Sequence, residues 1–179
     1  AYTALSILEI DRFRFSSMDL TLRFNFLERM FTDEFFFNED TTAEEEIAQS
    51  IDMFVQEGIL VPDTLSPDSY RITSRGLRKL KWLASFLLPF LESYKTSLLY
   101  FEKYKAGKHD GKDRIKKIRS LGTKLYKAQL IELKESLSQI NYRNAVTFFT
   151  KHRINGSEDH TQIEHYKQII ERLTILIST

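Results

Sequence analysis

Histidine is the side chain in this sequence best suited to acid–base catalysis or metal binding, so its spacing decides whether either is available. The sequence contains four histidines and no cysteine. His160 and His165 are five residues apart, which places them about 140° apart around a helix rather than on one face. No third ligand follows at a spacing typical of a metal site. We therefore expect no metal site in this chain.

Other common catalytic patterns do not occur in the sequence. It has no G-x-S-x-G nucleophile, no phosphate-binding P-loop and no dinucleotide-binding glycine pattern. Adjacent acids at Asp33–Glu34 and Glu44–Glu46 could supply paired carboxylates for acid–base chemistry. Such runs are more typical of helix starts, where acids face exposed amides. We therefore expect no catalytic and no cofactor-binding residue in this chain.

Charge is distributed unevenly, although the net charge is only +1. Residues 28–57 hold ten acids against Arg29 alone, whereas residues 103–127 hold ten cations against Asp110 and Asp113. The ten cations are our candidate contact residues: Lys103, Lys105, Lys108, Lys112, Arg114, Lys116, Lys117, Arg119, Lys124 and Lys127. They could contact an anionic membrane surface or an acidic protein face, or the acidic and basic faces could neutralise each other.

The first half of the chain must position the acidic segment, and its pattern resembles a winged-helix module. Apolar residues at helical spacing predict helices over residues 5–10, 16–31 and 42–57, with Thr41-Thr42 capping the last and Gly58 ending it. Strand-like residues 59–61 and 70–73 then flank turn-forming prolines and predict one small β-hairpin. We therefore predict a winged-helix-like subdomain over residues 1–75.

The second half, residues 76–179, is predicted to be a helical bundle built on a long helix that Pro89 kinks near Ser85. A second helix starting at the proline is the alternative. A loop is expected over residues 106–111, where Gly107 and Gly111 interrupt the helical pattern. Further helices are expected over residues 115–137, 141–151 and 157–177. The predicted fold class is mainly α with one hairpin.

The apolar run from Leu80 to Phe101, LKWLASFLLPFLESYKTSLLYF, raises the question of a membrane anchor. Only ten residues separate Lys81 from Glu92, whereas a spanning helix needs about 20 predominantly apolar residues. The run is therefore too short to cross a bilayer. Its wide apolar arc favours burial in a core, with a position in the membrane interface as the alternative.

Nucleic acid is not an expected partner, although lysine and arginine can bind its phosphates. The helix that a winged-helix module would insert into the groove, residues 42–57, is acidic. Its acids are Glu44, Glu45, Glu46, Asp52 and Glu57. These carboxylates would repel a duplex.

The ends and composition of the sequence suggest a piece of a larger protein. The chain begins AYTALSILEI, without an initiator methionine and without a secretory signal pattern. The absence of cysteine fits a cytosolic protein without proving one. We therefore expect a fragment of a longer chain.

Three long segments resemble the C-terminal region of the membrane-bound glycerol-3-phosphate acyltransferases, including their dihydroxyacetone-phosphate branch. They are LSILEIDRFRFSSMDLTLRFNFLERMFTDEFFF, ILVPDTLSPDSYRITSRGLRKLKWLASFLLPFLESYKTSLLYF and INYRNAVTFFTKHRINGSEDHTQIEHYKQIIERL. Together they span almost the whole chain. The resemblance depends on these long runs rather than on a short catalytic signature.

The resemblance implies a parent enzyme that transfers an acyl group from acyl-CoA or acyl carrier protein to the sn-1 hydroxyl of glycerol 3-phosphate. Such enzymes use an H-x-x-x-x-D motif, whose histidine is the general base. Here the residues five positions after the four histidines are Arg114, Ser157, His165 and Ile170. The motif is therefore expected in an upstream acyltransferase domain of the same chain.

The resulting hypothesis is a non-catalytic accessory domain in phospholipid biosynthesis. It would pack on the upstream domain and associate peripherally with the cytoplasmic side of a membrane. The alternative is a free-standing winged-helix module that binds protein or nucleic acid.

Overall fold

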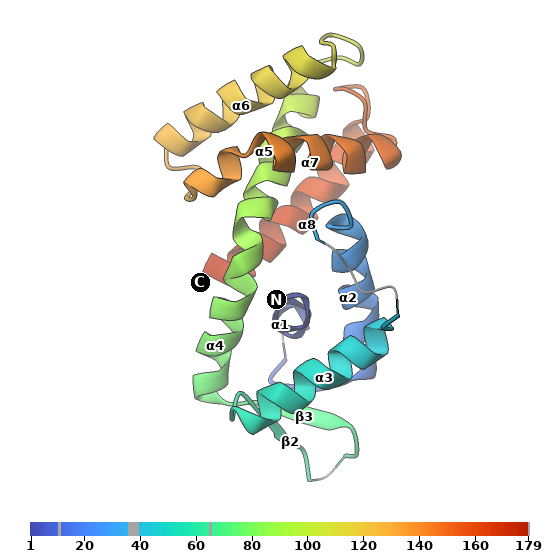
Figure 1. Ribbon diagram of the computed structural model, residues 1–179, viewed down its shortest axis with the longest axis vertical. Coiled ribbons are helices and arrows are strands. Elements are labelled where there is room, and N and C mark those ends of the chain that lie inside the picture. Colours follow the sequence, from blue (N-terminus) through green and yellow to red (C-terminus); the bar gives the residue numbers. More distant parts are fainter. Residues whose placement is uncertain (11, 36–39, 65, 179) are drawn as a thin grey trace. The chain divides into compact units, whose positions relative to one another are not determined.

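The computed structural model describes residues 1–10, 12–35, 40–64 and 66–178 and divides the chain into two compact units (Figure 1). Unit 1 comprises Ala1–Phe86 and Leu176–Thr179, and unit 2 comprises Leu87–Ile175. The described residues are mainly helical, with one small antiparallel sheet, which confirms the predicted fold class. The division into subdomains at residues 1–75 and 76–179 stays a prediction.

Unit 1 contains helices α1 (Tyr2–Glu9), α2 (Met18–Met30), α3 (Ala43–Gln56) and α4 (Ser74–Ala84). α3 begins where the sequence predicts, because Thr42 and Glu45 form a capping box: the Thr42 hydroxyl accepts from the Glu45 amide, and the Glu45 carboxylate accepts from the Thr42 amide. After α3, Gly58 has a φ of +67°, a left-handed conformation that glycine adopts readily.

The sheet of unit 1 contains three strands, β1 (Arg14–Ser16), β2 (Leu60–Pro62) and β3 (Ser69–Ile72), in the order β1-β3-β2. The predicted hairpin is β2–β3, with Leu60 opposite Ile72. β1 pairs antiparallel with β3 and is an addition to the predicted hairpin. Three residues are too few to produce a readable alternation in sequence.

Helix α1 lies at the centre of unit 1 and packs on α2 and α4 (Figure 1). All its residues from Thr3 to Leu8 are buried. The ring of Tyr2 contacts those of Phe24 and Phe31, which are also buried. The core of unit 1 therefore forms around a helix that is apolar on nearly all sides.

Unit 2 is built on helix α5 (Leu88–Lys103), which contacts α6 (Gly111–Lys127), α7 (Gln139–Lys151) and the 3₁₀ turn η2 (Lys134–Leu137). Helix α8 (His160–Ser178) follows. Buried aromatic rings from α5 and α7 fill the core, with the centroids of Tyr94 and Phe149 5.7 Å apart. The close contact between α6 and α7 brings together residues distant in sequence.

The apolar run from Leu80 to Phe101 forms two helices instead of one kinked helix. α4 ends at Ala84, a 3₁₀ turn η1 (Ser85–Leu87) follows, and Pro89 lies in the first turn of α5. The structure therefore has the alternative arrangement, in which a second helix starts at the proline. Proline is tolerated there because the backbone amide of a first-turn residue makes no hydrogen bond within the helix. No helix among the described residues has the length and apolarity needed to cross a membrane.

Candidate functional site

The histidines do not form a catalytic or metal cluster in the part of the chain that the structure describes. No group of three or more metal-binding side chains occurs there. The ring nitrogen Nδ1 of His109 lies 2.8 Å from the Tyr100 hydroxyl, and that of His152 lies 2.8 Å from the carbonyl oxygen of Phe148. Both rings therefore take part in local hydrogen bonds.

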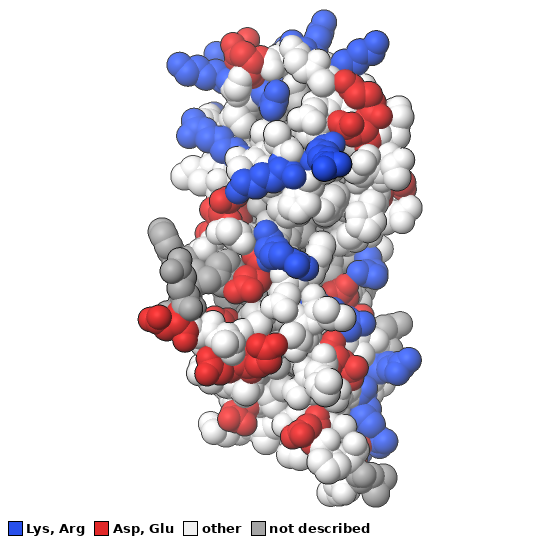
Figure 2. Space-filling model, turned by 90° about the vertical axis from the view of Figure 1, so that its right-hand side faces the viewer, with Lys and Arg blue, Asp and Glu red and all other residues white. Residues whose placement is uncertain are grey.

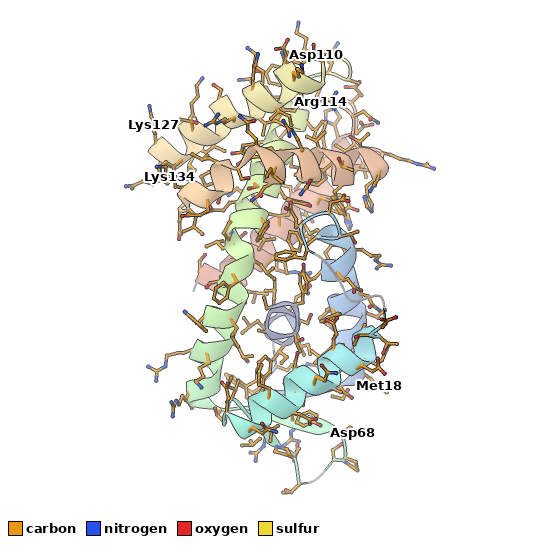
Figure 3. The ribbon with its side chains drawn as sticks, viewed as in Figure 1. Met18, Asp68, Asp110, Arg114, Lys127 and Lys134 are labelled. Atoms are coloured by element: carbon orange, nitrogen blue, oxygen red, sulfur yellow. The ribbon has the colours of Figure 1, made fainter. Side chains whose placement is uncertain are left out.

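The ten predicted cations all belong to unit 2, but they do not form one site. Lys103 ends α5, Lys105 and Lys108 lie between α5 and α6, and the other seven lie along α6. Figure 3 shows Arg114 near the start of α6 and Lys127 at its far end. A helix of this length extends about 25 Å, so a small ligand cannot contact both ends.

The structure selects a smaller set of cations, which line a groove between the first half of α6 and helix α7. The groove has a volume of about 610 Å³. Its basic side chains are Lys112, Arg114 and Lys116 from α6 and Arg143 from α7. Ile115 and Val146 contribute apolar surface, and none of the lining residues is acidic. We call this feature the α6–α7 groove.

Arg143 lies outside the predicted basic stretch and could not be singled out from the sequence. It is an isolated arginine between Tyr142 and Asn144, and only the packing of α7 on α6 brings it to Lys112 and Lys116. Four of the ten predicted cations, Lys117, Arg119, Lys124 and Lys127, lie on α6 without lining the groove.

Arg114 is held by aromatic neighbours from α5. Its guanidinium carbon lies 5.8 Å from the ring centroid of Phe101. Burial raises the pKa of Tyr100, and the nearby Arg114 guanidinium opposes this shift in part. The Nε atom of Arg114 is buried and has no hydrogen-bond partner among the described residues. Arg114 is therefore positioned by packing while part of its donor capacity remains unused.

The other groove cations are largely unpaired. The Lys116 ammonium lies 3.9 Å from the Asp113 carboxylate, a distant pair with both side chains mostly exposed. Asp110 caps α6 by accepting from the Asp113 amide at 2.8 Å. For Lys112 and Arg143, the described residues provide no ion pair. Figure 2 shows lysine and arginine side chains over the upper part of the view with some acidic side chains among them, and side chains of both charges over the lower part.

A second exposed feature lies on unit 1, at the end of α4 and in the turn that follows. Trp82 and Phe86 are 63% and 58% exposed, and their rings make an edge-to-face contact with centroids 5.3 Å apart. Arg75 and Arg78 are also exposed on α4, about two turns and one turn before Trp82, respectively. Leu80 and Ala84 on the opposite side are buried, so the predicted core burial holds for only one face of this segment.

Comparisons with known proteins place the chain in a family. No curated protein and no solved structure matches it. A family model described as the glycerol-3-phosphate acyltransferase C-terminal region matches residues 1–158. This match includes the α6–α7 groove and the Trp82–Phe86 pair. The chain therefore belongs to the family of glycerol-3-phosphate acyltransferase C-terminal regions.

Proposed function

We propose that this chain is a non-catalytic accessory domain of a glycerol-3-phosphate O-acyltransferase. The parent enzyme would transfer an acyl group from acyl-CoA or acyl carrier protein to the sn-1 hydroxyl, a step of phospholipid biosynthesis. The family match supports this proposal, as does the lack of an H-x-x-x-x-D motif in the sequence. The acyl donor and the catalytic base would then belong to an upstream acyltransferase domain.

The observation that carries the accessory role is the exposed Trp82–Phe86 pair with its neighbouring arginines. Tryptophan and arginine are enriched among residues that dominate binding energy at protein interfaces. Two large aromatic rings more than half exposed leave apolar area in water that a partner surface would cover. We take the occupant to be the acyltransferase domain of the parent chain, because the family is a region of that enzyme.

The arrangement of unit 1 also supports the proposal that its binding partner is a protein. The order α1-β1-α2-α3-β2-β3 is the order expected of a winged-helix module, and we propose that relationship. Glu44, Glu45 and Glu46 occupy the first turn of α3. A nucleic-acid duplex would be repelled by these carboxylates, whereas a basic protein surface would be attracted.

Peripheral association with the cytoplasmic side of a membrane belongs to the same proposal. The cations of unit 2 support it, since each lysine or arginine near an anionic leaflet contributes about 1 kcal/mol of attraction. Salt should weaken this attraction, because the charges are exposed.

The proposal is tested in the full-length parent enzyme with the double variant Trp82→Ser/Phe86→Ser. The matched control is Met18→Ser/Leu22→Ser, which alters two apolar side chains on α2 that are 85% and 81% exposed. We expect the aromatic variant to lower the rate of acyl transfer in detergent by about tenfold, since losing two interface anchors costs at least about 1.4 kcal/mol. The control should keep the original rate.

Far-ultraviolet circular dichroism should show both variants folded. If the aromatic variant transfers acyl groups as fast as the control, the proposed domain contact is wrong.

A further inference from the structure

We propose that the α6–α7 groove binds a phosphate monoester, either as a small soluble molecule or as a lipid headgroup. The groove lies entirely on unit 2, and the aromatic pair assigned to the domain contact lies on unit 1. The inference therefore goes beyond the proposed packing role and can fail without affecting it.

Two helices contribute cations to the groove at complementary positions. Lys112 and Lys116 are four residues apart on α6, so they lie one turn apart on the same side of that helix. Gln139, Arg143 and Thr147 repeat the same spacing on α7. Because these rows line one groove, an anion between them would contact positive charge from both walls.

The charge of the groove suits a dianion. Lys112, Arg114, Lys116 and Arg143 together provide four positive charges, and the lining contains no carboxylate. A phosphate monoester carries about −1.5 to −2 charges near neutral pH and three strong acceptor oxygens. Arginine can donate two parallel hydrogen bonds to such a group, and Lys112 and Lys116 would add charge-assisted bonds.

The groove also has donor capacity that the fold leaves unused. Arg143 is exposed and has no ion pair among the described residues, so its guanidinium can donate to a ligand in the groove. The first turn of α6 is already occupied, since Asp110 accepts from the Asp113 amide. The ligand would therefore be held by side chains along the groove rather than by the helix end.

The apolar surface of the groove indicates that the ligand has an organic part. Ile115 is buried and Val146 is half-buried, and both line the groove between the basic walls. A nonpolar surface beside the charges would accept a carbon chain or backbone while the phosphate contacts the cations. Diffuse electrostatic attraction alone would not require such a surface.

Lys117 and Lys124 allow the groove to be tested against general positive charge. Both are exposed on α6 and neither lines the groove. The groove variant is Lys116→Gln/Arg143→Gln, and the matched control is Lys117→Gln/Lys124→Gln. Each double variant removes two positive charges, so attraction that depends only on net charge should fall equally in both.

The experiment has two arms, each using the 179-residue chain. In the first, inorganic phosphate is titrated while nuclear magnetic resonance follows the amide signals of α6 and α7. In the second, flotation measures binding to phosphatidylcholine vesicles that contain phosphatidic acid, with phosphatidylglycerol at equal surface charge as the comparison. Phosphatidic acid has the monoester headgroup, whereas phosphatidylglycerol has a diester.

We expect the groove variant to bind at least about tenfold more weakly than the control variant, a difference of about 1.4 kcal/mol, because it loses charge-assisted hydrogen bonds that the control keeps. Binding of inorganic phosphate alone would identify a soluble ligand, and preference for phosphatidic acid vesicles would identify a lipid headgroup. The proposal is overturned if neither arm detects binding, if both variants lose affinity equally, or if inorganic phosphate does not bind and both vesicle types bind equally well.

Discussion

Glu92 forms hydrogen bonds to the segment that connects α6 with α7. The residue is only 4% exposed, and its carboxylate accepts hydrogen bonds from the backbone amides of Glu132 and Leu133 at 2.6 and 3.1 Å. The Ser136 hydroxyl donates to the same carboxylate. Buried acids persist when their oxygens are fully hydrogen-bonded. Glu92 thereby fixes the segment that leads into α7 and its Arg143.

Replacing Glu92 with alanine should destabilise the chain by about 3 kcal/mol, because two backbone amides and a hydroxyl lose a charged partner inside the fold. Urea unfolding measures this change. The control is Glu102→Ala, which removes a partly exposed ion pair with Lys167 at 3.0 Å and should cost less than about 1 kcal/mol. An equal decrease in the free energy of unfolding of the two variants would contradict the assigned role of Glu92.

The hydrogen bonds of Asp19 predict the direction in which the stability of the chain changes with pH. The amide and hydroxyl of Ser16 both donate to its carboxylate at 2.8 Å, and these bonds hold the pKa of Asp19 below its ordinary value of 3.8. Because the pKa is lower in the folded state, the hydrogen bonds from Ser16 stabilise the folded state fully above pH 3.8. This stabilisation is lost as the pH falls through the folded-state pKa of Asp19.

The variant Asp19→Asn should therefore be less stable than the original chain at about pH 7, and the difference should be smaller at about pH 2, because the stabilisation is lost as the pH falls through the folded-state pKa of Asp19. The effect should be small, because the carboxylate is exposed to solvent. Urea unfolding at the two pH values measures it. A difference that grows toward low pH would show that the Ser16 bonds do not favour the charged form.

At the scale of elements, Gly76 allows α4 to approach the end of α3 and the start of the sheet. A Cβ atom at this position would overlap the backbone carbonyl of Ile59. That carbonyl accepts from the Thr73 amide at 3.1 Å and cannot move without disturbing both elements. The close approach therefore requires glycine.

Gly76→Ala is expected to destabilise the chain by about 3 kcal/mol, since an added methyl in a packed contact forces the backbone apart. Gly111→Ala is the matched change, because an added Cβ there has no heavy atom within 4 Å. Its effect should stay within about 0.5 kcal/mol. Thermal or urea unfolding compares the two, and a neutral Gly76→Ala would contradict the close contact with Ile59.

The elements that could be predicted from sequence are those with local signals. Capping at Thr42, the glycine after α3 and the helical spacing of apolar residues gave α3 and its end correctly. Strand β1 has only three residues and depends on pairing with β3, so no local sequence pattern predicts it. The α6–α7 groove and the role of Glu92 depend on contacts between distant segments, and those contacts have no local periodicity.

At the scale of the whole molecule, the charge asymmetry in the sequence corresponds to the division into units. The acid-rich segment at residues 28–57 belongs to unit 1, and the ten cations of residues 103–127 belong to unit 2. The two units therefore present different chemistry to partners. This division is consistent with separate roles, an aromatic contact surface on unit 1 and an anion-binding groove on unit 2.

The central claim is that this C-terminal region supports catalysis that takes place elsewhere in the parent enzyme. The most direct measurement is acyl transfer to glycerol 3-phosphate by the full-length enzyme, by the enzyme lacking residues 1–179 of this sequence, and by these residues alone, with recovery of each protein in the membrane fraction. We predict no turnover by the isolated chain, and a reduced rate or reduced membrane recovery for the truncated enzyme. Unchanged rate and unchanged recovery after truncation would contradict the claim.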